Sequence, residues 1–371
     1  MIVRLARLPG EFRWIAVLAA MTLLATAAAF ISGALVGVTT GEVYAGYLSG
    51  IWDLVPAVVL LGLLAYTIVC AARRVEQPLT KLKPFLADRF GTLDRAAGTI
   101  GPIVMMPLLM GAFGTLKQML PLVNPFGWDN VFAKVGPLLF DGLHAWQITH
   151  YFFGSPVATL ILDRIYTGWI LILFLAVVGM ALFAAPRLRA RFFLSFGAGW
   201  LLLGVVVAYF LSSAGPCYAA RVGSPSAADF SILMARLRAI DAAGYHLAAL
   251  QWQDVLWKAE SSHHYGFALG ISAMPSMHNA ISFLYVLAAA RSRRAIRITA
   301  WLFAVTILIA SVHLGWHYLV DGLIGWAGMT LIWWGADAVL RWSGYQPAPS
   351  LRLIGATAQP ERDARPRRLV A

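Results

Sequence analysis

The sequence predicts an all-α polytopic membrane protein, a helical bundle with about eight transmembrane helices. Of its 371 residues, 60% are hydrophobic and 12% are Asp, Glu, Lys or Arg, whereas soluble proteins are about 45–50% apolar and about 25% charged. The apolar residues form long runs, and the charged residues lie in short clusters between them. This composition excludes a water-soluble globule and a wholly disordered chain. The two cysteines close at most one bridge, which excludes a disulfide scaffold.

Eight runs are apolar enough to cross a bilayer, which takes a helix of about 20 residues because the hydrocarbon layer is roughly 30 Å thick. The expected spans are residues 14–38, 51–72, 99–116, 157–185, 192–213, 276–290, 298–314 and 318–340. The sixth and seventh runs are the shortest. The first run is too long and too weakly bounded by small residues for a cleaved signal peptide, so we expect a membrane anchor.

The Lys and Arg residues between the spans predict the orientation. With the N-terminus inside, the inner segments carry 22 of them and the outer connections carry 6. The positive-inside rule therefore places both termini in the cytoplasm. It also explains the net charge of +12 as a fit to an anionic inner leaflet, so the sequence requires no nucleic-acid partner.

The spans divide the chain into three predicted parts. Residues 1–98 form a two-helix anchor with a basic cytoplasmic loop, residues 99–340 form a six-helix core, and residues 341–371 form a flexible cytoplasmic tail rich in Arg, Pro and Ala. Two long connections are expected outside. Residues 117–156 are rich in aromatic side chains suited to the headgroup level, and residues 214–275 include an amphipathic helical stretch at about 227–258.

All eight histidines fall on the outer side in this topology, in the outer connections or at the outer ends of helices. They are His144, His150, His246, His263, His264, His278, His313 and His317. Ionisable side chains are costly near a membrane, so their gathering at one face predicts a functional site there.

The strongest candidate for chemistry is the pair His317 and Asp321. Residues four apart share one face of a helix, so the carboxylate can reach the imidazole. A carboxylate that holds one ring nitrogen fixes the tautomer and leaves the other nitrogen free to attack, which makes a nucleophile with its orienting group. The spacing fits equally well an interfacial histidine beside an aspartate that caps a turn.

A second candidate lies at the predicted start of the sixth span. Pro275 suits the first turn of a helix, which puts Ser276 and His278 where unpaired backbone N–H groups bind phosphate well. His278 can also protonate a leaving oxygen as a general acid. A plain helix start with an incidental histidine explains the same residues.

A third, weaker signal follows the fifth span. Gly215 and Pro216 make a rigid turn, and Arg221 offers a forked donor for phosphate oxygens. A Gly-Pro pair is also common in turns that follow a helix and have no other role.

Residues 275–278 (Pro-Ser-Met-His) and 317–321 (His-Tyr-Leu-Val-Asp) resemble the second and third signature motifs of the type 2 phosphatidic acid phosphatase superfamily. The longer forms Met-Pro-Ser-Met-His and Gly-Trp-His-Tyr-Leu-Val-Asp are similar to its inositol phosphorylceramide synthase branch and to related bacterial membrane proteins. The resemblance covers about residues 99–340. Residues 116–129 also resemble a stretch of the bacterial relatives, with no role assigned to them.

This resemblance implies a six-helix core with a metal-independent site and no cofactor. It implies that His317 attacks phosphorus, that Asp321 orients His317, and that His278 assists the leaving group. Pro275, Ser276, Gly215 and Pro216 would then contact the substrate.

The sequence departs from the superfamily pattern in two places. The first signature, a Lys followed seven residues later by Arg-Pro, has no match before His278, and residues 215–221 occupy its expected region. In the third signature, Ser311 stands where an Arg is usual, six residues before the nucleophile. The candidates to replace these phosphate-binding cations are Lys117, Arg221, Lys258 and His313. The inositol phosphorylceramide synthase branch tolerates such losses, which favours that branch over a plain phosphatase.

We therefore expect an integral membrane enzyme, in a bacterial inner or plasma membrane, with its site facing the periplasm. Its substrate is a phospholipid or lipid phosphate, and its intermediate is a phosphohistidine. Water as acceptor makes it a phosphatase, and a lipid or sugar hydroxyl makes it a phosphotransferase. The large outer connections are suited to excluding water, which favours transfer.

Two alternatives remain open at this stage. The first is a non-catalytic lipid transporter or binding protein with the same shell, which is expected to carry charges at the bilayer midplane. The second is a metal-dependent lipid phosphotransferase, which needs clustered carboxylates, and Asp321 has no acidic neighbour within a helical turn. The donor, the acceptor and the oligomeric state do not follow from the sequence.

Overall fold

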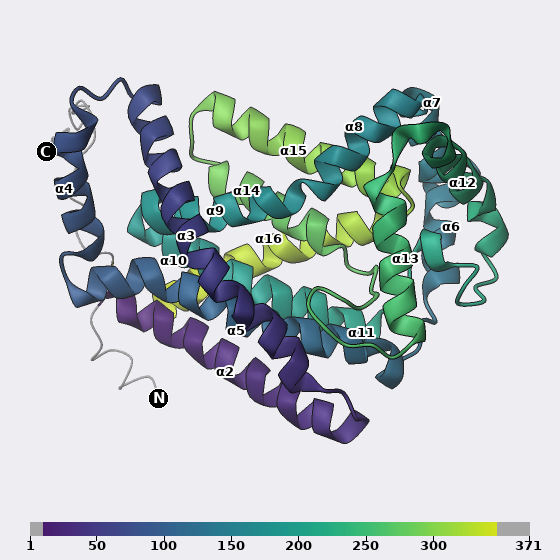
Figure 1. The fold of residues 1–371 in the computed structure, drawn as a ribbon, viewed down its shortest axis with the longest axis horizontal. Coiled ribbons are helices and arrows are strands. Elements are labelled where there is room, and N and C mark those ends of the chain that lie inside the picture. The colour runs from purple at the N-terminus through teal and green to yellow at the C-terminus, as the bar shows by residue number, and fades with distance from the viewer. Residues whose placement is uncertain (1–9, 347–371) are drawn as a thin grey trace, which may run out of the picture.

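The computed structural model describes residues 10–346, apart from the side chains of residues 50–55, 57 and 58. Within this part the chain forms helices and no strand, which confirms the all-helical class (Figure 1). Arg4, Arg7 and most of the expected cytoplasmic tail lie outside the described residues.

Most helices of the bundle run roughly along the long axis of the molecule, and α3 (Thr40–Ala72) crosses them obliquely (Figure 1). The bundle helices are α2 (Gly10–Val36), α3, α5 (Leu93–Val123), α8 (Pro156–Thr167), α9 (Trp169–Phe183), α10 (Pro186–Ala198), α11 (Ala208–Phe210), α14 (Met277–Ala289), α15 (Arg294–His313) and α16 (Leu319–Trp342). A π-helical stretch, η1 (Gly199–Val207), joins α10 to α11.

Six helical segments of the described chain are long and apolar enough to cross a membrane. They are Gly10–Val36, Leu93–Val123, Pro156–Phe183, Pro186–Phe210, Arg294–His313 and Leu319–Trp342. Two shorter apolar helical segments, Val59–Ala72 and Met277–Ala289, coincide with the second and sixth expected spans. The prediction of a membrane protein is confirmed, and the count of about eight spans stays a prediction.

Helix α5 is longer at both ends than the span expected from hydropathy, residues 99–116. Thr92 caps α5 by accepting a hydrogen bond from the N–H of Arg95, so this helix begins before the predicted 99. It also continues past Lys117 to Val123. A charge ended the predicted apolar run, but a single charged side chain does not end a helix.

Four helices cross one end of the bundle and form what we call the outer cap, a name taken from the predicted orientation: α6 (Asp129–Leu139), α7 (Ala145–Phe153), α12 (Ala227–Ile240) and α13 (Ala248–Ser261) (Figure 1). The expected amphipathic stretch at 227–258 is two helices. The π-helical turn η3 (Asp241–Tyr245) contains Gly244 at φ +92°, which no regular helix accommodates.

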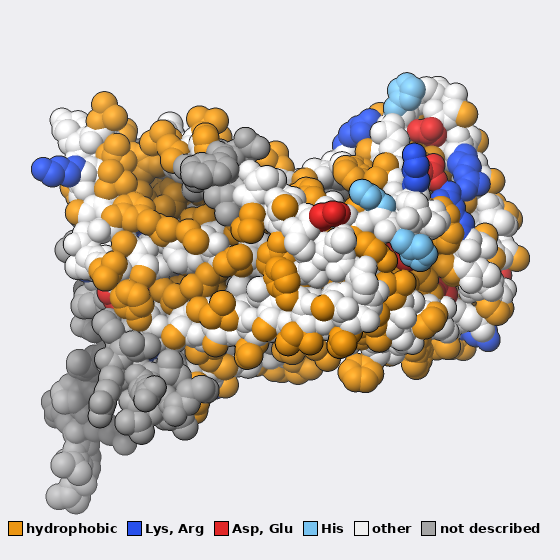
Figure 2. Space-filling model, turned by 60° about the horizontal axis from the view of Figure 1, so that its bottom comes forward, with side chains coloured by type: hydrophobic (Ala, Val, Ile, Leu, Met, Phe, Trp, Pro, Cys, Tyr) orange, Lys and Arg blue, Asp and Glu red, His pale blue; other side chains and the backbone are white. Residues whose placement is uncertain are grey.

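Hydrophobic side chains cover the flank of the bundle, whereas charged and histidine side chains gather over the end formed by the outer cap (Figure 2). Large apolar residues on the bundle helices are exposed, among them Leu24, Leu302 and Leu331. An exposed apolar band of this size is expected of a surface that faces lipid.

The opposite end of the bundle holds α4 (Pro78–Phe90) and both ends of the described chain. There, Tyr345 donates to Glu11 Oε1 (2.8 Å) and Arg13 donates to the carbonyl of Gly344. Trp14 and Leu18 of α2 belong to the same buried cluster as the residues of α14 and α16. The first helix is thus packed into the core. The division at residue 98 stays a prediction.

Candidate functional site

The third motif lies at the turn from α15 into α16, at the end of the bundle that the outer cap covers. Asp321 is fully buried in the first turn of α16, and one of its oxygens, Oδ2, accepts a hydrogen bond from the backbone N–H of Tyr318 (2.9 Å). The same oxygen lies 3.3 Å from Nδ1 of His317, which is 7% exposed. Asp321 therefore caps the turn and holds the imidazole at the same time, so the two interpretations of this spacing do not compete.

The second motif begins α14. Ser276 is the N-cap residue, because its Oγ accepts the backbone N–H of Asn279 (3.5 Å). Pro275 stands just before this cap rather than inside the first turn. The expected place of Pro275 in the first turn is therefore wrong. The reason is that the hydroxyl of Ser276 caps the helix, so the helix begins after Ser276. His278 is the second residue of the helix.

Hydrogen bonds join the two motifs directly. The backbone N–H of Ser276 donates to the carbonyl of Asp321 (3.1 Å). The amide Nδ2 of buried Asn279 donates to the hydroxyls of Ser276 (3.0 Å) and Ser311 (3.1 Å). Ser311, which replaces the usual Arg, thus serves as a buried link between α14 and α15.

His278 occupies the same region as His317. Its ring lies between Tyr166, stacked at 4.5 Å between centroids, and Trp169, at 4.2 Å. It interacts electrostatically with both His317 and Lys117. Tyr166 also stacks on Trp316, the residue before His317, with 6.2 Å between centroids, so the two motif histidines lie at the same end of the bundle, the one that the outer cap covers.

The surroundings of the candidate cations differ, and they show which of them lies near a motif histidine. Lys117, near the outer end of α5, is half-buried and acts electrostatically on His278 and on Glu260 of α13. Arg221 pairs with Asp254 (2.6 Å) and lies over the ring of Trp257. Lys258 is exposed on α13. Lys117 is the member of this set that the fold places beside a motif histidine.

His313 is held in a network of its own. It is fully buried, its ring stacks on that of His150 (centroids 3.7 Å apart), and its two nitrogens contact the hydroxyls of Thr159 (3.0 Å) and Thr149 (3.3 Å). Nε2 of His150 donates to the carbonyl of His313 (2.9 Å). Burial lowers the pKa of His150, which favours its neutral form. With both nitrogens engaged, His313 ties α15 to α7 and α8, and its placement gives no support to a role in binding phosphate.

The turn at Gly215 and Pro216 packs against the third motif. Gly215 has φ +98°, and a Cβ there would lie 2.5 Å from the carbonyl oxygen of Trp316. The N–H of Cys217 donates to the carbonyl of Gly315 (2.8 Å). This turn therefore supports the backbone just before His317, which is a role that the sequence did not suggest.

Replacing Gly215 by Ala is expected to destabilise the protein by about 2 kcal/mol or more, because the new methyl group meets a backbone oxygen at a positive φ. Gly223→Ala is the matched control: Gly223 also has a positive φ (+69°) but open space around it. Chemical unfolding in detergent measures the difference. Equal stability of the two variants would show that the contact with Trp316 carries no energy.

A small, partly open cavity borders His317 and Tyr318. Its other walls come mainly from apolar residues of α6, α7 and α12, among them Phe132, Trp146 and Phe230. The outer cap thus places an apolar space next to the imidazole of the third motif.

The fold and this site define an integral membrane protein with a carboxylate-held histidine and a second histidine at one end of a helical bundle. A family model of the PAP2 superfamily matches residues 139–335, more than half of the chain, and the chain belongs to that superfamily. This confirms the superfamily whose signature motifs the sequence resembles. Members are generally phosphatases or phosphotransferases. Neither a curated protein nor a solved structure matches the chain.

Proposed function

We propose that this protein is a metal-independent lipid phosphotransferase or phosphatase that works through a phosphohistidine on His317. The observation that carries the proposal is the joint between the two motifs: Asp321 holds Nδ1 of His317, accepts the N–H of Ser276 on its carbonyl, and so brings α14 with His278 to the same place. Because Nδ1 is engaged, the lone pair of Nε2 is the one available for attack.

The reaction takes two steps. In the first, Nε2 of His317 forms a bond to phosphorus, the bond from phosphorus to the leaving oxygen breaks, and His278 gives that oxygen a proton. In the second, an acceptor hydroxyl or water forms a bond to phosphorus, the N–P bond breaks, and His278 receives the proton of the acceptor. Asp321 keeps the ring in one orientation and stabilises its positive charge during both steps.

Negative charge on the phosphoryl oxygens needs nearby donors. The first backbone N–H groups of α14, after the cap at Ser276, are suited to this task. The ammonium group of Lys117 acts electrostatically on His278. Because of this interaction, Lys117 is our candidate for the phosphate ligand that replaces the missing Arg and Lys of the signatures. It comes from α5, ahead of the matched region 139–335.

Replacing Lys117 by Gln is expected to lower kcat/KM by about 10- to 100-fold, since a hydrogen bond from a charged group is worth about 1.5–3 kcal/mol. The assay is steady-state turnover of a labelled lipid phosphate. Arg238→Gln, which removes an exposed cation from α12 of the outer cap, is the control and should behave like the wild type. Equal activity of the two variants would remove Lys117 from the site.

Transfer to a lipid or sugar hydroxyl is favoured over hydrolysis, with an inositol phosphorylceramide synthase-like activity as the specific form. The outer cap lies over the end of the bundle that holds His317, and the small cavity beside His317 is lined mainly by apolar side chains, which supports exclusion of water during transfer. The site opens at the outer leaflet of a bacterial inner or plasma membrane, with both termini in the cytoplasm. The excess of Lys and Arg in the inner segments supports this orientation.

Product analysis tests the proposal. Purified protein is given labelled phospholipid or lipid phosphate donors, with and without ceramide, inositol lipids or polyprenol phosphates, in the presence of a chelator. We expect turnover that survives the chelator and a labelled product that depends on the acceptor. Free phosphate as the sole product would reject transfer and leave a phosphatase. A requirement for Mg²⁺ would reject the metal-independent site, and binding without turnover would favour a lipid transporter or binding protein.

A further inference from the structure

A buried carboxylate, Asp129, connects two segments that surround the proposed nucleophile. Asp129 is the first residue of α6 and is 2% exposed. Its Oδ2 accepts the N–H of Ala214 (2.9 Å), and its Oδ1 accepts the N–H of Gly215 (2.8 Å) and the hydroxyl of Tyr318 (3.0 Å). Three hydrogen bonds to one charged group are strong and directional, and they offset the cost of burying it.

One side of this carboxylate fixes the turn that follows α11. Besides the two bonds to Asp129, the carbonyl of Ser212 accepts the N–H groups of Gly127 and Trp128 (3.1 Å each). The same turn contacts the residues just before His317. The N–H of Cys217 donates to the carbonyl of Gly315, and Gly215 lies close to the carbonyl of Trp316. Asp129 therefore fixes a surface against which residues 315–316 rest.

The other side of the carboxylate fixes the residue after His317. Tyr318 donates its hydroxyl to Asp129 and its backbone N–H to Asp321 (2.9 Å). The peptide that carries the imidazole is thus held before His317 by the turn and after it by Tyr318. Asp129 is the group common to both supports.

We propose that Asp129 is a positioning residue that sets the place of His317 for attack on phosphorus. This inference rests on the proposed function. Asp129 lies outside the matched region 139–335, so the family match gives it no role. Small errors in placing a nucleophile are costly, because a displacement of about 1 Å can lower a rate about 100-fold.

Two substitutions test the assignment by steady-state kinetics and thermal unfolding. Asp129→Asn keeps the shape but turns one acceptor into a donor, and we expect kcat to fall about 10- to 100-fold with KM changed by less than about threefold. Tyr318→Phe removes the hydroxyl alone, and we expect kcat to fall about three- to tenfold. The double variant should lose less than the product of the two factors, because both changes remove the same contact.

The chain offers a matched control in Asp163 of α8. This fully buried carboxylate accepts the N–H groups of Ala248 (3.0 Å) and Ala249 (2.8 Å) at the start of α13, and neither of these residues belongs to a motif. We expect both Asp163→Asn and Asp129→Asn to lower the unfolding temperature, and we expect Asp163→Asn to leave the kcat of the folded protein unchanged.

The outcomes separate this inference from the proposed function. Wild-type protein without turnover, or His317→Ala protein that retains it, overturns the proposed function and this inference with it. An active wild type whose Asp129→Asn and Tyr318→Phe variants keep full kcat overturns the positioning role alone. If Asp129→Asn does not fold, Tyr318→Phe decides the question, because it deletes one hydroxyl and leaves the backbone bonds of Asp129 in place.

Discussion

Replacing His317 by Ala is expected to reduce turnover of a labelled lipid phosphate by about 10⁴- to 10⁶-fold, which is the range seen when the nucleophile of a hydrolytic site is removed. The reason is that no other group in the proposed mechanism forms the bond to phosphorus. The imidazole is 7% exposed and makes one hydrogen bond, to Asp321. Asp321 keeps its bond from the N–H of Tyr318 in this variant, so we expect a folded protein with a lowered unfolding temperature, which thermal unfolding checks. Single-turnover assays will measure the rate. Separating acid-labile from acid-stable phosphate in the same samples will detect the phosphohistidine intermediate.

The control for this experiment is His144→Ala. His144 lines the same cavity as His317, but its partner is different: its Nε2 lies 3.7 Å from Oδ2 of Asp229 in the outer cap. Loss of this ring changes the cavity without touching the proposed nucleophile, so its effect on turnover should stay below about tenfold. A His317→Ala protein that turns over at the rate of His144→Ala would transfer the nucleophilic role to another residue.

The sequence predicts the parts of the site that lie close together along the chain. His317 and Asp321 are four residues apart, and they are in contact as the spacing predicts. The reason differs from the expected one, because His317 precedes the N-cap residue Tyr318 and Asp321 reaches it from the first turn of α16 rather than along one helix face. Ser276 and His278 begin α14 within two residues of the expected start. Long apolar runs also fix the membrane class, because composition is enough to decide it.

The parts that the sequence leaves undetermined depend on contacts between distant segments. Asp129 meets Tyr318 across 189 residues, and His150 meets His313 across 163. A single sequence carries no signal for such pairings. His313 shows the consequence: its place at the outer end of a helix suggested a substrate ligand, whereas stacking on His150 and bonds to two threonine hydroxyls enclose it.

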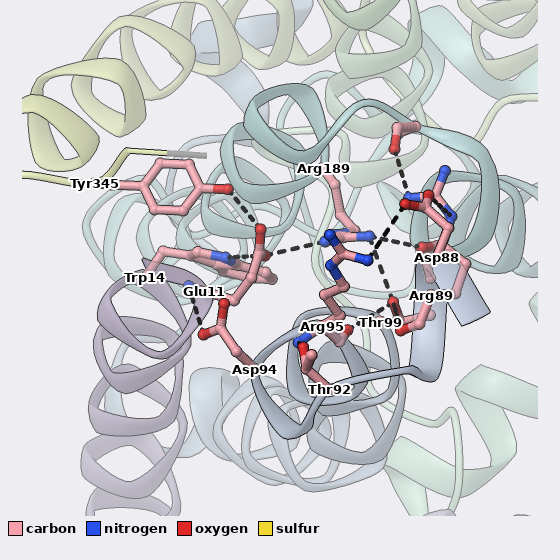
Figure 3. Close-up of polar contacts among 12 residues, drawn as sticks. Glu11, Trp14, Asp88, Arg89, Thr92, Asp94, Arg95, Thr99, Arg189 and Tyr345 are labelled. Atoms are coloured by element: carbon pink, nitrogen blue, oxygen red, sulfur yellow. Dashed lines mark hydrogen bonds and ion pairs between the residues drawn. The ribbon is translucent and has the colours of Figure 1, made fainter. Parts of the chain in front are cut away.

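A second network, far from the site, is expected to give the largest effect on stability. At the opposite end of the bundle, Glu11 (1% exposed) and Arg189 (2% exposed) form an ion pair with 3.1 Å between Oε2 and Nη2 (Figure 3). Trp14 and Tyr345 donate to the two oxygens of Glu11 (2.8 Å each). The pair thus joins α2 and α10 to the segment that follows α16. Gly98 of α5 packs so closely that a Cβ there would lie 2.4 Å from Glu11 Oε2.

Arg189→Ala is expected to lower the free energy of unfolding by about 3–5 kcal/mol, because it leaves the carboxylate of Glu11 buried without its cation. Arg187→Ala is the matched control, since Arg187, two residues away, pairs with Asp337 at 2.9 Å from a half-exposed position where a pair is worth about 1 kcal/mol or less. The double variant Glu11→Ala with Arg189→Ala should recover part of the loss, because it removes the orphaned charge as well. Chemical unfolding in mild detergent compares the three proteins. If Arg189→Ala unfolds no more readily than Arg187→Ala, then water reaches Glu11, and the joint between the first helix and the core is held by apolar packing instead.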